Sequence, residues 1–213
     1  MTELPSAWKE TPEHSETIFM VTGFMRSGTS MMMKALGAGG MPLAYEPKRD
    51  EMNQRFGDSD YQPNEGGFYE MARETYQHPD FPLPFKGRLI KGLVGCLQRL
   101  PVAKYKIVMM MRDPEEIRQS YEAFFNKPCP NIGGRKFTNK NYQKAIEEHI
   151  EQIDNRLDAE VLIVNYREVV EDPEKRFRFL LNWGRWPIDP IKAAAVVNPD
   201  KCRFRRENLE DGI

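Results

Sequence analysis

Cysteine and histidine are scarce in this sequence and scattered along it. The 213 residues include three of each, with no Cys-x-x-Cys pair and no spacing typical of metal ligands, which argues against a disulfide framework or a zinc cluster. Apolar runs such as 107–111 fall well short of the roughly 20 residues that a membrane helix needs. Residues 1–16 are polar and carry several glutamates, unlike a signal peptide. We therefore expect a cytoplasmic protein with no metal and no membrane span.

An excess of charge of either sign is lacking as well. The 31 basic and 32 acidic side chains nearly cancel, so the net field offers no general attraction to nucleic acid or to an anionic membrane. We expect no nucleic-acid partner, and any site for an anion must be local.

Short apolar segments alternate with stretches of helical pattern along most of the chain. Aspartate followed by proline predicts a capped helix start at Asp113, Asp172 and Asp189, and Glu116 completes a capping box with the first of these. Strands that alternate with helices predict a three-layer α/β fold, P-loop-like in outline, with helices on both sides of a central, mainly parallel sheet. The expected strands are 17–22, 88–91, 105–111 and 161–164, and the helices between them are 30–36, about 92–100, 113–126 and 141–157.

The length suits one domain over residues 1–213, with residues 1–16 as an N-terminal extension. Two stretches, 41–86 and 127–138, are irregular and carry many of the prolines and several glycines. We expect both to form loops around the functional site.

A glycine loop, Gly23 to Ser30, joins the first expected strand to the first expected helix. A strand that leads through glycines into a helix N-terminus presents backbone N–H groups and the positive end of the helix dipole to a phosphate-like anion. Thr29 stands where a nucleoside-triphosphate kinase normally has a lysine, which argues against a kinase. The anion-binding residues expected in this loop are Arg26, Ser27, Gly28, Thr29 and Ser30.

A second candidate anion site follows the strand at 105–111. Arg112 stands at the carboxyl end of that strand and Ser120 lies two turns into the next helix, so both can reach one anion in the crevice where α/β sheets bind ligands. The alternative for Arg112 is an ion pair with Asp113 or Glu116. Two anion sites at equivalent strand ends favour a nucleotide phosphorylated at both ends.

These residues resemble the motifs of sulfotransferases that use 3′-phosphoadenosine 5′-phosphosulfate (PAPS). The segment Gly23-Phe-Met-Arg-Ser-Gly-Thr-Ser30 is similar to their 5′-phosphosulfate loop, and Arg112-Asp-Pro with Ser120 is similar to their 3′-phosphate motif. The segments 161–173 and 64–70 also resemble pieces of that family, the latter with one glycine displaced, and compact bacterial and phage members come nearest.

The resemblance implies transfer of a sulfuryl group from PAPS, leaving adenosine 3′,5′-bisphosphate. It implies a role for Lys91 near the transferred group, for Tyr166 beside adenine, and for the basic residues Arg203 and Arg206 over the 3′-phosphate. An ordinary surface lysine, a core aromatic and a solvated basic tail are the alternatives for these positions.

The sequence departs from cytosolic relatives that act on phenols and steroids at the position of the catalytic base. Those relatives have a histidine shortly after the lysine that corresponds to Lys91, and this chain has none there. A glutamate downstream of the loop serves some other members, which makes Glu46 the first candidate base and Glu70 the second. For each glutamate the alternative is a solvated loop acid.

We therefore expect a sulfotransferase that acts on a hydroxyl or amine of a small-molecule, glycan or peptide acceptor. We expect the loops 41–86 and 127–138 to bind that acceptor. Two other functions stay open: a P-loop nucleotide kinase or phosphotransferase, which would need ATP and Mg²⁺, and a non-catalytic nucleotide-binding protein on the same fold.

Overall fold

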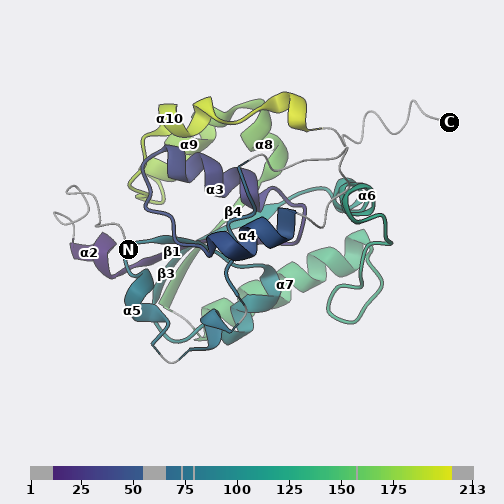
Figure 1. The fold of residues 1–213 in the computed structure, drawn as a ribbon, viewed down its shortest axis with the longest axis horizontal. Coiled ribbons are helices and arrows are strands. Elements are labelled where there is room, and N and C mark those ends of the chain that lie inside the picture. The colour runs from purple at the N-terminus through teal and green to yellow at the C-terminus, as the bar shows by residue number, and fades with distance from the viewer. Residues whose placement is uncertain (1–11, 55–65, 73, 79, 157, 203–213) are drawn as a thin grey trace.

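The computed structural model describes residues 12–54, 66–72, 74–78, 80–156 and 158–202. Its centre is a sheet of four strands in the order β2-β1-β3-β4, in which all neighbouring strands are parallel. Figure 1 shows this sheet between two groups of helices, so the predicted α/β fold with a parallel sheet is confirmed. The strands are β1 (Ile18–Gly23), β2 (Leu89–Lys91), β3 (Lys104–Met111) and β4 (Asp158–Asn165).

The strand register aligns the carboxyl ends of the strands, which the predicted motifs follow. Val21 of β1 pairs with Lys91 of β2, and Gly23 pairs with Met110 of β3. Met111 pairs with Asn165 of β4. Because the strands are parallel, the residues that follow them emerge along the same edge of the sheet.

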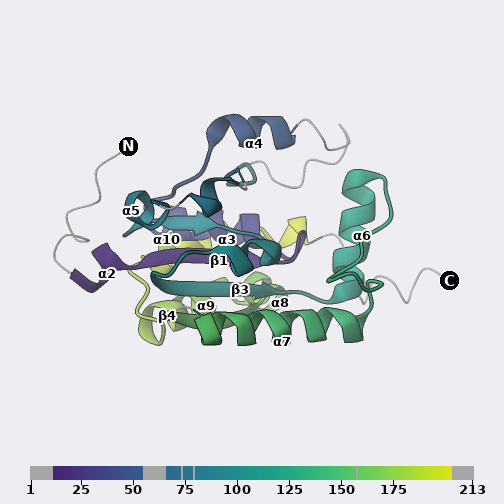
Figure 2. The same ribbon diagram turned by 90° about the horizontal axis from the view of Figure 1, so that it is seen from below.

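Each face of the sheet carries its own hydrophobic core. Above the strands in Figure 1, one core packs α3 (Thr29–Ala38), α8 (Tyr166–Glu171), α9 (Pro173–Asn182) and α10 (Pro190–Ala195) against Phe19 and Val108. On the opposite face, the other core packs α6 (Pro114–Phe125) and α7 (Asn139–Arg156) against Met20 and Ile107. Neighbouring residues of one strand serve opposite cores because side chains alternate between the faces. Figure 2 shows α7 running along the sheet.

The helix starts predicted from Asp-Pro pairs are all present. Asp113, Asp172 and Asp189 are N-caps of α6, α9 and α10, and each side chain accepts a backbone N–H from the first turn of its helix. The carboxylate of Glu116, expected to complete a capping box, forms an ion pair with Arg112.

The shorter elements lie mostly in the stretch between β1 and β3. The segment expected as a helix over about 92–100 is a short 3₁₀ helix, η2 (Val94–Arg99), and glycines within it and before it weaken an α-helix. Part of the predicted loop 41–86 lies outside the described residues.

No helix in the described part of the chain combines the length and apolarity needed to cross a membrane. The remaining elements are α2 (Pro12–Glu16), α4 (Pro47–Gln54), η1 (Thr75–Gln77), α5 (Pro82–Phe85) and η3 (Pro199–Lys201).

Candidate functional site

A pocket of about 570 Å³ lies at the carboxyl edge of the sheet. From β1 the chain passes to β2 on one side and then to β3 on the other. The pocket lies beyond β1, at this switch point, which is where open α/β sheets bind ligands. Its lining includes Met25, Arg26, Gly28, Thr29, Ser30, Lys34, Phe68, Glu70, Lys91, Leu93, Arg112, Ser120, Phe124, Phe125, Tyr166, Asn198 and Lys201.

The glycine loop connects β1 to α3 as predicted. Gly28 is the N-cap of α3 and has φ of 97°, a value that strains residues with a side chain. A Cβ atom at Gly28 would lie 2.3 Å from the ring of Tyr166, so this position also has no room for one. Arg26, two residues earlier, also has a positive φ, 69°. The loop thus closes tightly over Tyr166, and the N-terminus of α3 faces the pocket.

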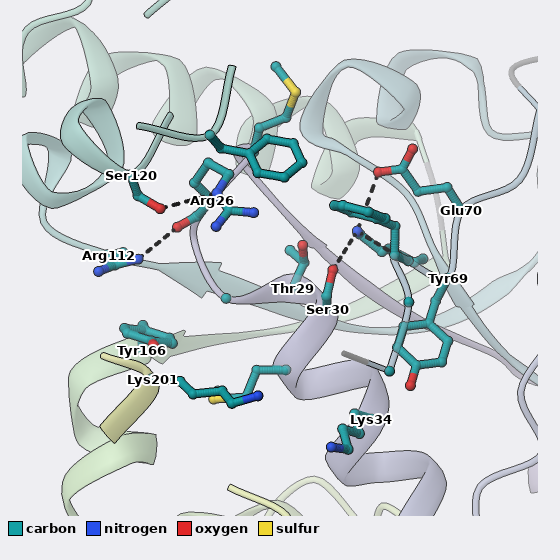
Figure 3. A pocket seen from close by; sticks show the side chains of 18 of the residues that line it. Arg26, Thr29, Ser30, Lys34, Tyr69, Glu70, Arg112, Ser120, Tyr166 and Lys201 are labelled. Atoms are coloured by element: carbon teal, nitrogen blue, oxygen red, sulfur yellow. Dashed lines mark hydrogen bonds and ion pairs between the residues drawn. The ribbon is translucent and has the colours of Figure 1, made fainter. Parts of the chain in front are cut away.

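The two predicted anion motifs meet at Arg26. Its Nε donates a hydrogen bond of 3.1 Å to Oγ of Ser120, and its backbone oxygen accepts one of 3.1 Å from Arg112. Figure 3 shows the three residues converging from the loop, β3 and α6. Residues 94 positions apart in the sequence therefore share one site.

Arg112 also forms the ion pair that was its alternative reading. Its Nε lies 2.9 Å from Oε2 of Glu116, and both side chains are buried. The guanidinium also lies over the ring of Tyr166, 4.5 Å from the ring centre. The ion pair fixes Arg112 in place, and Arg112 still lines the pocket. The ion pair with Glu116 is therefore compatible with the predicted role of Arg112 in binding an anion.

Lys91 is a buried charge at the centre of the site. Its Nζ donates to Oγ of Ser30 at 3.1 Å and to the backbone oxygen of Phe68 at 2.7 Å, and it lies 3.4 Å from Oε1 of Glu70. Burial lowers the pKa of Lys91, and the charge of Glu70 opposes that shift. Lys91 is therefore not the ordinary surface lysine that was its alternative.

The hydroxyl groups of the loop take different directions. Ser30 and Thr29 line the pocket, whereas Oγ of Ser27 donates to the backbone oxygen of Phe24 at 2.7 Å. Ser27 is fully buried and is absent from the pocket lining. Its side chain closes the loop instead of facing a ligand.

The structure separates the two candidate bases. Glu70 lines the pocket (Figure 3), and its Oε1 lies 3.4 Å from Nζ of Lys91. Glu46 does not line it, because its Oε1 accepts hydrogen bonds from the backbone N–H of Ala72 and the hydroxyl of Thr75. The N–H of Glu46 donates to the backbone oxygen of Glu70. Glu46, the first candidate from the sequence, thus holds the segment that carries the second.

The predicted adenine and 3′-phosphate contacts are placed only in part. Tyr166 lines the pocket and is also a core residue, and its burial raises its pKa. Lys201, at the end of η3, lines the pocket near Tyr166 (Figure 3). Arg203 and Arg206 lie outside the described residues.

Several pocket residues are not expected at the site from the sequence. Lys34 lies one turn after Ser30 on α3, and that spacing was the available signal. Phe68 and Phe124 form part of an apolar wall. Phe68 belongs to the segment 64–70 that resembles a family motif, whereas no sequence pattern marks Phe124. Among the described residues that line the pocket, Glu70 is the one acidic residue. Five are basic: Arg26, Lys34, Lys91, Arg112 and Lys201. This balance favours a ligand with several negative charges.

Metal ligands are not clustered within the described ranges: no group of three or more His, Cys, Asp or Glu side chains is placed to hold an ion. The absence of a metal from the reaction stays a prediction.

Comparison with known proteins gives only distant likenesses. No protein-family model matches the chain, and no curated protein matches it. A solved sugar kinase from Janibacter sp. HTCC2649 matches with 15% identity over 86% of this chain and 99% of that chain, with a TM-score of 0.39. A solved sulfotransferase from Mycobacterium tuberculosis H37Rv matches with 12% identity over 97% of this chain and 80% of that chain, with a TM-score of 0.41. Both are structures of transferases, but with TM-scores this low neither likeness decides between sulfuryl and phosphoryl transfer.

Proposed function

We propose that this protein is a sulfotransferase that uses PAPS to sulfate a hydroxyl or amine of an acceptor. The observation that carries the proposal is the meeting of Arg26, Arg112 and Ser120 in one pocket at the N-terminus of α3. A nucleotide with anionic groups at both its 5′ and 3′ positions needs two such sets of donors within one site.

The residues of the pocket fit this ligand in charge and in size. The first N–H groups of α3 have no partner within the helix, so together with Arg26 they would hold the 5′-phosphosulfate. Ser120 and Arg112 would hold the 3′-phosphate, and Tyr166 with Val196 would flank adenine. Five basic side chains around a pocket of about 570 Å³ suit a small polyanion.

When bound, PAPS supplies the sulfuryl group: the acceptor atom bonds to sulfur while the bond from sulfur to the 5′-phosphate oxygen breaks, and that electron pair leaves with adenosine 3′,5′-bisphosphate. Arg26 stabilises the charge that develops on the leaving phosphate. Lys91, held by Ser30 and Phe68, places a positive charge beside the transferred group. Glu70 takes the proton of the acceptor, since among the described residues that line the pocket it is the one with a carboxylate.

One titration tests the donor. Calorimetry should show that adenosine 3′,5′-bisphosphate binds more tightly than ATP with Mg²⁺, and at least about tenfold more tightly than AMP, which lacks the 3′-phosphate. Preference for ATP with Mg²⁺ would instead support a nucleotide kinase. Binding of adenosine 3′,5′-bisphosphate without PAPS turnover on a broad acceptor panel would support a non-catalytic nucleotide-binding protein.

A further inference from the structure

Five consecutive residues, 66–70, line the pocket as a strap. Tyr69 has φ of 57° and Gly67 has φ of 99°, so the backbone turns sharply within the strap. These turns let Phe68, Tyr69 and Glu70 all contribute to one lining. A residue with a side chain keeps a positive φ only when its surroundings hold it there.

Two charged side chains hold the strap at Phe68. Oδ1 of Asp50, on α4, accepts the backbone N–H of Phe68 at 2.6 Å. Nζ of Lys91 donates to the backbone oxygen of the same residue at 2.7 Å. Asp50 is 6% exposed, so it is held in place, and its hydrogen bond is a strong, charge-assisted one. The backbone of Phe68 is therefore fixed from both sides.

The strap completes an apolar wall next to the donor loop. The ring centres of Phe68 and Phe124 are 5.8 Å apart, and those of Phe124 and Phe125 are 4.6 Å apart. The guanidinium of Arg26 lies 4.9 Å from the ring centre of Phe124. Glu70 follows Phe68 by two residues and reaches the same pocket. Figure 3 shows Tyr69 and Glu70 on the side of Ser30 opposite to Tyr166 and Lys201.

We propose that Asp50 is a positioning residue for the acceptor, and that the wall it holds takes an acceptor with a flat apolar body. The inference rests on the proposed function, because it assigns this half of the pocket to the acceptor. A flat ring on the wall of Phe68 and Phe124 places its hydroxyl or amine between Arg26 and Glu70, where transfer takes place. The rings of Phe68, Phe124 and Phe125 themselves offer a glycan or a peptide no hydrogen-bonding group.

The test uses β-naphthol as a flat neutral probe, titrated with and without adenosine 3′,5′-bisphosphate. Asp50→Ala removes the acceptor of the Phe68 N–H and should weaken β-naphthol binding by about tenfold. Its affinity for adenosine 3′,5′-bisphosphate should stay within about twofold of the wild type. Asp50→Asn keeps an oxygen at Oδ1 and should restore most of the β-naphthol affinity. Glu51→Gln, an exposed acid next to Asp50 on α4, is the matched control and should bind both ligands normally.

The apolar acceptor, the positioning role of Asp50 and the proposed sulfotransferase function are each contradicted by a different result. Wild-type protein that binds adenosine 3′,5′-bisphosphate but not β-naphthol would refute the apolar acceptor. Normal β-naphthol binding by Asp50→Ala, or an equal loss of both ligands, would refute the positioning role. β-Naphthol binding that depends on Asp50, in a protein that does not bind adenosine 3′,5′-bisphosphate, would refute the proposed function and support the strap.

A second variant covers the case in which Asp50→Ala does not fold. Phe68→Ala leaves Asp50 in place and removes the ring from the wall. It should weaken β-naphthol binding by about tenfold and leave adenosine 3′,5′-bisphosphate binding unchanged. Unchanged β-naphthol binding in Phe68→Ala would contradict the assignment of the wall.

Discussion

The Nε atom of Arg26 donates a hydrogen bond to Oγ of Ser120, and this contact ties the glycine loop to helix α6. The Ser120→Ala variant removes a hydroxyl from the expected 3′-phosphate site. Its affinity for adenosine 3′,5′-bisphosphate should fall about tenfold in calorimetry. Arg26→Ala should cost more, with kcat/KM for PAPS lowered at least about 100-fold, because it removes a charge that stabilises the leaving phosphate.

Two exposed or remote positions give matched controls for these variants. Ser15→Ala changes a serine in α2, and Arg178→Ala breaks an exposed ion pair with Glu174 on α9. Both should bind and turn over PAPS as the wild type does. Wild-type affinity in Ser120→Ala would show that the 3′-phosphate is bound elsewhere.

The contact between Gly28 and Tyr166 predicts a large effect from one added methyl group. In Gly28→Ala the new Cβ meets both an unfavourable φ of 97° and the ring of Tyr166. The free energy of unfolding should fall by about 3 kcal/mol in denaturant titration, and adenosine 3′,5′-bisphosphate binding should weaken with it.

Gly40→Ala separates the two causes. Gly40 has a similar φ of 103°, but a Cβ there meets no atom within 4 Å. This variant should lose only about 1 kcal/mol of unfolding free energy. Equal losses in the two variants would mean that the contact with Tyr166 adds nothing.

The position of Glu70 predicts that it, and not Glu46, is the base. Glu70→Gln should lower kcat at least about 100-fold, because the amide cannot take the acceptor proton. Its affinity for adenosine 3′,5′-bisphosphate should stay close to that of the wild type. Steady-state kinetics with PAPS and calorimetry measure the two quantities separately.

Glu46→Gln is the matched comparison. Its amide oxygen can still accept from Ala72 and Thr75, so kcat should fall less than about threefold. A larger loss of kcat in Glu46→Gln than in Glu70→Gln would return the base to Glu46.

The Cys129 thiol should react slowly at neutral pH. Burial, reinforced by the charge of Glu122, raises its pKa from 9.0 to about 11. A raised pKa leaves less thiolate below that pH, so alkylation at about pH 8 should be at least tenfold slower than for free cysteine and should speed up as the pH approaches 11. Mass spectrometry of the labelled peptide follows the rate.

Glu122→Gln tests the cause of that shift. Removing the negative charge lowers the pKa of Cys129 and should speed its alkylation, while Cys129→Ser identifies the labelled peptide. A rate that does not change in Glu122→Gln would leave burial alone as the cause.

Much of the fold follows from signals that act over a few residues. An aspartate side chain caps N–H groups two or three positions away, so the starts of α6, α9 and α10 are readable from Asp113, Asp172 and Asp189. The apolar strands and the glycine loop are local patterns as well. The 3₁₀ helix η2 is shorter and tighter than the helix expected over about 92–100, because six residues show too little periodicity to define the helix type.

The sequence by itself determined that a glycine loop with Arg26 precedes a helix and that Arg112 and Ser120 follow a later strand. Only the tertiary structure decided which side chains share the pocket. Both Glu46 and Glu70 are loop acids in the sequence. Their roles separate in the structure because Glu46 accepts hydrogen bonds from Ala72 and Thr75 while Glu70 faces Lys91. Asp50 and Phe68 gain their roles from a hydrogen bond between segments 18 residues apart. Side-chain direction in such segments depends on packing between distant parts of the chain, and no local pattern encodes it.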